Sequence, residues 1–105
     1  MSRIEAIQKI IAQSPNDPFP RYGLAMEFKN AGRAEEAHQA FAELESRFPD
    51  YVAQYLMHGN VLASLHKIED AKGVYQRGIA AARKKGDNHA LGELQGALAG
   101  LPTDD

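Results

Sequence analysis

A period of 34 residues constrains this chain more than any other feature of its sequence. When residues 18–51 are aligned with residues 52–85, small residues meet small ones and large apolar residues meet large ones. The matched pairs are Ala25 with Gly59, Phe28 with Leu62, Ala37 with Ala71, and Phe41 with Tyr75. Self-similarity at a period of this size is typical of repeat proteins, whose stacked units share one continuous core.

Helical spacing of apolar residues fills the stretches between turn signals. We predict no strand and six helices, at about 2–13, 18–30, 34–47, 51–64, 68–85 and 88–100. Asp17, Asp50 and Asp87 each precede one of these stretches, where a carboxylate can accept from a free backbone N–H at the helix start. Gly32 suits a left-handed turn after the second helix, and His66 stands at the equivalent turn of the second repeat.

With this period and these residues, the chain resembles the tetratricopeptide repeat family, whose unit is a helix-turn-helix of the same length. The matching positions in the first copy are Leu24, Ala25, Phe28, Gly32, Ala37, Phe41, Leu44 and Pro49, and in the second Tyr55, Gly59, Leu62, Ala71 and Tyr75. Three positions depart from the family pattern. Arg21 replaces an aromatic residue, His58 replaces a leucine, and Arg83 replaces the closing proline, so the fifth helix is expected to continue toward Lys85.

The resemblance implies an all-α fold, a right-handed superhelical stack of helix-turn-helix repeats in a single domain over 1–101. Within it we assign an N-terminal half-repeat helix at 2–13, complete repeats at 18–51 and 52–85, and a C-terminal capping helix at 88–100. Residues 102–105 are expected to fray, because they carry little apolar surface.

In this family the first helix of each repeat lines a concave groove that holds a peptide or helix of a partner protein. Carried onto this sequence, the partner-binding positions are Phe19, Tyr22, Met26, Lys29, Asn30, Leu56, Met57, Asn60 and Ser64, with Ala53 beside them. Tyr22, Met26, Leu56 and Met57 would form an apolar strip, which either faces the groove or packs between helices. Family members that grip a chaperone's C-terminal carboxylate have Lys and Asn at the places of Tyr22 and Met26, so a partner with an apolar anchor is favoured here.

Catalytic and metal chemistry find no support in the sequence. The chain has no cysteine, which removes thiolate metal sites and thiol nucleophiles. Its four histidines include no pair one helical turn apart, and no phosphate-binding glycine loop or nucleophile motif is present. We therefore predict a protein that is not an enzyme and needs neither a cofactor nor a metal.

The charge balance argues against nucleic acid as a partner. Twelve basic and fourteen acidic residues give a formal net charge of −2, which supplies no excess positive field. The N-terminus alternates charged and apolar residues, and no run approaches membrane-spanning length, so the sequence predicts no membrane association and a cytoplasmic location.

The leading hypothesis is a non-enzymatic adaptor or interaction module that binds a protein segment. The alternative is a structural unit in which the same apolar strip joins two copies into a homo-oligomer.

Overall fold

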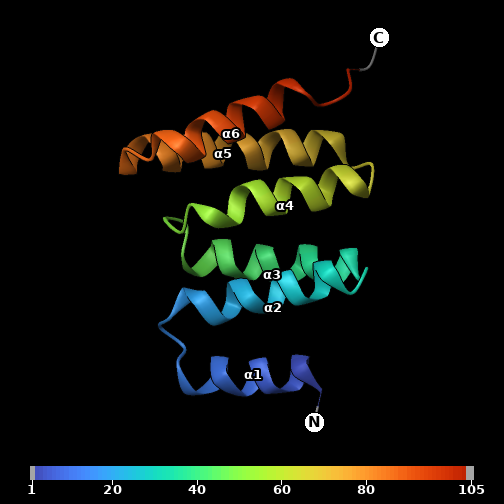
Figure 1. The fold of residues 1–105 in the computed structure, drawn as a ribbon, viewed down its shortest axis with the longest axis vertical. Helices are drawn as coiled ribbons and strands as arrows, with labels where there is room; N and C mark the ends of the chain where they lie inside the picture. Colours follow the sequence, from blue (N-terminus) through green and yellow to red (C-terminus); the bar gives the residue numbers. More distant parts are fainter. Residues whose placement is uncertain (1, 104–105) are drawn as a thin grey trace.

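The computed structural model describes residues 2–103, which form six helices and no strand (Figure 1). The helices are α1 (Arg3–Gln13), α2 (Pro18–Asn30), α3 (Ala34–Arg47), α4 (Ala53–Ser64), α5 (Ile68–Lys85) and α6 (Asn88–Ala99). The predicted all-α fold is confirmed, and each helix begins and ends within two residues of its predicted bounds. Helix α5 continues to Lys85, as the missing proline at position 83 indicated.

Two of the three predicted aspartate caps are present. Asp17 accepts from the backbone N–H of Phe19 at 3.0 Å, and Asp87 accepts from that of Ala90 at the same distance. The prediction for Asp50 was wrong, because α4 begins only at Ala53, after Val52, which makes no side-chain cap. A turn closed by the Tyr51 N–H to Phe48 carbonyl bond, 3.1 Å, has Pro49 and Asp50 at its centre and delays the helix start.

Three helices end with the same backbone turn. Gly32, His66 and Gly86 all have positive φ angles, 76°, 61° and 71°. The next residue donates its N–H to a carbonyl five residues back at 2.9 Å, in the pairs Arg33 to Phe28, Lys67 to Leu62, and Asp87 to Ala82. This turn pairs carbonyls that a helix end leaves free. His66 therefore takes the turn position of Gly32, as predicted, without the freedom of a glycine.

Successive helices pack on one another from α1 to α6, and α4 also contacts both α2 and α6. Figure 1 shows the helices following one another along the longest axis, with α1 and α6 at opposite ends of the stack. The described chain measures 46 × 30 × 19 Å. Helix α4 thus lies beside both α2 and α6, which are not adjacent to it in the sequence.

The core divides into two clusters that meet at α4. The N-terminal cluster joins α2 and α3 to Val61 of α4, and the C-terminal cluster joins α4, α5 and α6. All eight residues of the four matched pairs are buried. Alanine and glycine let the helix axes approach, and the large residues fill the space beside them.

The chain leaves α6 through a short extension. Leu101 packs against the C-terminal cluster, whereas Pro102 and Thr103 are exposed and have no helical structure. The remainder of the predicted frayed tail, residues 104–105, lies outside the described residues. No helix within residues 2–103 combines the length and apolar character needed to cross a bilayer.

Candidate functional site

The face shared by α2, α4 and α6, hereafter the groove, contains an apolar hollow of about 210 Å³. Its lining residues are Tyr22, Val52, Ala53, Leu56, Met57, Ala90, Glu93 and Leu94. Three of the nine predicted binding residues, Tyr22, Leu56 and Met57, thus lie together on this surface. Residues of both repeats and of α6 therefore line the hollow.

The side chains of the apolar hollow are held by the core. The ring of Tyr22 lies 6.3 Å from that of Phe41, edge to face, and 5.5 Å from that of Tyr51. Met57 packs against the N-terminal cluster and Leu56 against the C-terminal cluster, and both are half-buried. Tyr22, Leu56 and Met57 therefore pack against the core and also border the hollow.

A second hollow, of about 450 Å³, lies where the C-terminal halves of α2 and α4 meet. Its lining residues are Lys29, Gly32, Ala34, Asn60, Val61 and Ser64, and three of them belong to the predicted set. The two hollows follow one another along α4, the apolar one at Leu56 and Met57, the second at Asn60 and Ser64.

The remaining predicted residues line neither hollow. Met26 is half-buried and packs against the N-terminal cluster. Phe19 is 66% exposed, and Asn30 is exposed beside the end of α2. The structure therefore brings six of the nine residues onto two hollows and leaves these three outside them.

Helix α6 contributes residues that sequence reasoning missed. Ala90, Glu93 and Leu94 line the apolar hollow, and Glu93 is the charged residue among those that line it. Its Oε1 lies 3.2 Å from Nε2 of His89. The signal was present in the period itself, because residues 86–98 lie one repeat length beyond 52–64, where a third first helix would stand.

The fold also brings into contact two histidines, His38 and His58, that are 20 residues apart in the sequence. Nδ1 of His38 on α3 lies 2.8 Å from Nε2 of His58 on α4, and the His58 ring stacks on Phe41 with centroids 5.3 Å apart. Burial, and next the neighbouring His38, lower the pKa of His58 to about 4, so its ring is neutral at physiological pH.

Nδ1 of His58 is buried without a hydrogen-bond partner. A neutral ring that carries its proton on Nε2 and donates to His38 avoids an unpaired buried donor at Nδ1. No group of three or more potential metal ligands occurs among residues 2–103. The arrangement therefore fits a partly buried hydrogen bond between α3 and α4.

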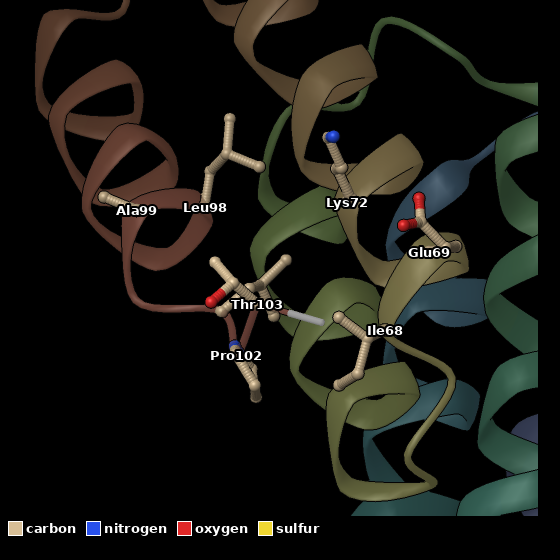
Figure 2. A pocket seen from close by; sticks show the side chains of 8 residues that line it. Ile68, Glu69, Lys72, Leu98, Ala99, Pro102 and Thr103 are labelled. Carbon is tan, nitrogen blue, oxygen red and sulfur yellow. The ribbon is translucent and has the colours of Figure 1, made fainter. Parts of the chain in front are cut away.

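A third hollow, of about 390 Å³, lies outside the groove, and none of the predicted binding residues lines it. Figure 2 shows Ile68, Glu69 and Lys72 of α5 on one side of it, and Leu98 and Ala99 of α6 on the other, with Pro102 and Thr103 between them. It is formed where the chain leaves α6 and passes the start of α5.

Several known proteins are similar to this chain in sequence or in structure. No family model matches it. A TPR repeat-containing protein from Pseudomonas aeruginosa is 26% identical over 91 residues, which is 87% of each chain. The crystal structure of a tetratricopeptide repeat domain protein from Salinibacter ruber is 40% identical, with a TM-score of 0.75, and the match covers 79% of this chain and 93% of that one. The solution structure of a Bordetella parapertussis protein, 21% identical, shares the fold over 94% of this chain and 86% of its own, with a TM-score of 0.79.

Proposed function

Because the chain belongs to the tetratricopeptide repeat family, we propose that it is an interaction module that holds a segment of a partner protein in the groove across α2, α4 and α6. The observation that carries this proposal is the apolar hollow, where Tyr22, Leu56 and Met57 converge from two helices that are not consecutive in the chain. Aromatic residues and methionine are enriched where protein interfaces are buried.

The size of the apolar hollow indicates what it holds. Its volume of about 210 Å³ lies below the range of roughly 300–1,000 Å³ that is usual for small-molecule sites. It suits one apolar side chain of a partner, with the rest of the segment lying along the groove. Met57 adds an unbranched side chain that adapts its shape to such an anchor.

The affinity follows from the small number of anchors. A short groove with one apolar hollow supplies few of the contacts that carry binding energy, and ordering the bound segment opposes them. We expect dissociation constants of about 1 μM, which correspond to a binding free energy of about −8 kcal/mol.

Selection from a library of random 12-residue segments displayed on phage tests the proposal. The targets are the wild-type protein, Ala53→Glu, and Ala80→Glu. Ala53 is exposed, lines the apolar hollow and is the first residue of α4, where an acidic side chain favours the helix dipole. Ala80→Glu is the matched control, because Ala80 is exposed on α5 and lines none of the three hollows described above.

The wild type should enrich segments that share a large apolar residue. These segments should bind Ala80→Glu equally and Ala53→Glu at least roughly tenfold more weakly, since a charge beside the anchor has no counter-ion to offset its desolvation. Equal binding to Ala53→Glu would place the binding surface elsewhere. A wild type that enriches nothing, but sediments as a dimer that Ala53→Glu dissociates, would support the homo-oligomer instead.

A further inference from the structure

One carboxylate borders the apolar hollow. Glu93 of α6 lines this hollow, and the other seven lining residues are uncharged. Its side chain is 48% exposed, so a segment bound in the groove can reach the carboxylate. The equivalent residues of the two repeats are Ala25 and Gly59, which are small and buried. The charge at this position is therefore specific to α6.

Glu93 has no lysine or arginine partner within residues 2–103. The three groove helices carry one other acid, Glu27 of α2, which pairs with Arg3 of α1 at 2.8 Å. The ion-pair partner of Glu93 is His89, at 3.2 Å, and His89 carries a charge only when it is protonated. A negative charge therefore remains at the apolar hollow while His89 is neutral.

Two structural roles do not account for Glu93. An acid favours the helix dipole in the first turn, and Glu93 lies beyond the first turn of α6. Its contact with His89 joins two exposed side chains four residues apart, and such pairs add little to stability. The carboxylate is thus available to a ligand at little cost to the fold.

The lining of the apolar hollow also suits part of a basic side chain. Lysine and arginine bury their aliphatic stems along apolar surface and keep the charged head near water. Tyr22, Leu56 and Met57 supply such a surface, and Glu93 lies beside it. A carboxylate and a positively charged head form a charge-assisted hydrogen bond, which is stronger than a neutral one.

From these contacts we infer that the groove selects a partner segment with a lysine or arginine close to its apolar anchor, and that Glu93 binds the positive head of this side chain. Leu56 and Met57 lie on α4, which packs against α6. The axes of packed helices are about 8–10 Å apart. A basic residue within about four positions of the anchor spans this distance, in a helical or an extended segment. The inference rests on the proposed function and names the partner chemistry of the same groove.

The test uses a second phage library of 12-residue segments with one fixed leucine and all other positions random. The targets are the wild type, Glu93→Gln, Glu93→Lys and Gln39→Lys. Glu93→Gln keeps the size of the side chain and removes its charge. Gln39→Lys is the matched control, because it changes the net charge by the same amount as Glu93→Gln. Gln39 is exposed on α3 and lines none of the three hollows described above.

The wild type and Gln39→Lys should both enrich lysine or arginine within about four residues of the leucine. Glu93→Gln should lose this preference, and Glu93→Lys should replace it with aspartate or glutamate. The strongest wild-type segment is then made as a peptide, with its basic residue unchanged or replaced by glutamine. The replacement should weaken binding to the wild type roughly fivefold, because the pair is partly exposed. Binding to Glu93→Gln should not change, since the partner charge is gone.

Three results would contradict the inference. Leucine-dependent segments without a basic preference would refute the role of Glu93 and leave the proposed function intact. A basic preference that persists on Glu93→Gln would place the recognition elsewhere, and one that is also lost on Gln39→Lys would assign it to net charge. If the wild type captures no segment from either library, the proposed function itself fails, and the inference with it.

Discussion

The two repeats bury the same pattern with different residues. In residues 18–51 the small residue is Ala25 and the large one Phe41, whereas in residues 52–85 they are Gly59 and Tyr75, and all four are buried. A Cβ on Gly59 would lie 2.1 Å from Cε1 of Tyr75, so this ring fills the space that a methyl group would need. Where the second repeat has the smaller residue, a large neighbour thus occupies the freed space.

A second exchange follows the same rule. Leu44 of the first repeat is fully buried, and the residue one period later is Gly78. A Cβ on Gly78 would lie 2.4 Å from Cβ of Tyr55, and the residue that matches Tyr55 in the first repeat is Arg21. At this contact the large side chain of the second repeat, Tyr55, lies on its first helix, α4. The large side chain of the first repeat, Leu44, lies on its second helix, α3. Repeats that differ at single positions therefore keep one packing plan through compensating pairs.

The largest expected effect comes from removing the large member of either pair. Phe41→Ala and Tyr75→Ala should each cost about 3–5 kcal/mol of unfolding free energy, since both rings are buried and leave cavities. Urea denaturation measures the loss. Phe19→Ala is the control, because Phe19 is 66% exposed, and it should cost no more than about 0.5 kcal/mol. A loss below about 1 kcal/mol at either ring would contradict the equivalence of the two repeats.

Glycines of the two repeats should respond differently to an added methyl group. Gly59→Ala should cost about 2–3 kcal/mol, because the added methyl group overlaps the packed ring of Tyr75. Gly23→Ala, in α2 with no atom within 4 Å of an added Cβ, should instead gain about 0.5–1 kcal/mol from helix propensity. Thermal unfolding of both variants measures the contrast. A neutral Gly59→Ala would show that the ring of Tyr75 can move away from the added methyl group.

Acid should weaken the second repeat through His58, whose counterpart in the first repeat is Leu24. The pKa of His58 falls to about 4 in the folded chain from an ordinary 6.5. Between these values the unfolded chain binds a proton that the folded chain does not, so stability is complete above about pH 6.5 and falls as the pH decreases. From pH 7 to pH 5 the loss from this group should be about 2 kcal/mol.

His58→Leu copies the first repeat and isolates this effect. Denaturation at pH 7 and pH 5 should show a smaller difference for the variant than for the wild type, because the proton-binding group is gone. The other groups that act on His58 are His38 on α3, Glu45 on α3 and Arg77 on α5. All three remain in the variant, so an unchanged pH dependence would assign the acid sensitivity to groups other than His58.

The smallest expected effect concerns the turns that end α2 and α4, which are the first helices of the two repeats. His66→Gly should gain about 0.5–1 kcal/mol, because a left-handed conformation costs other residues more than glycine. Gly32→His is the reciprocal change and should lose a similar amount, since both positions have positive φ. Melting temperatures of the pair measure both signs. A destabilised His66→Gly would indicate that the imidazole contributes a compensating contact.

The sequence predicted what depends on local pattern. Helix bounds, the left-handed turns and the burial of the matched pairs follow from spacing within a few residues or from the period. It did not predict the His38–His58 contact, because residues 20 apart on two helices meet only once those helices pack. The Asp50 cap failed for a related reason, since the turn after Phe48 competes with the helix start. Glu93 was overlooked because α6 was treated as a cap rather than as a third groove helix.

The central claim is that α2, α4 and α6 form the surface that binds a partner segment. Its most direct test is to titrate the uniformly ¹⁵N-labelled protein with a synthetic peptide of the strongest selected sequence and follow the backbone amide shifts. We predict that the largest shifts fall around Tyr22, Leu56 and Glu93, extend to Asn60, and leave the exposed faces of α3 and α5 unchanged. Shifts centred on α3 and α5, or on the hollow beside Lys72, would contradict the claim.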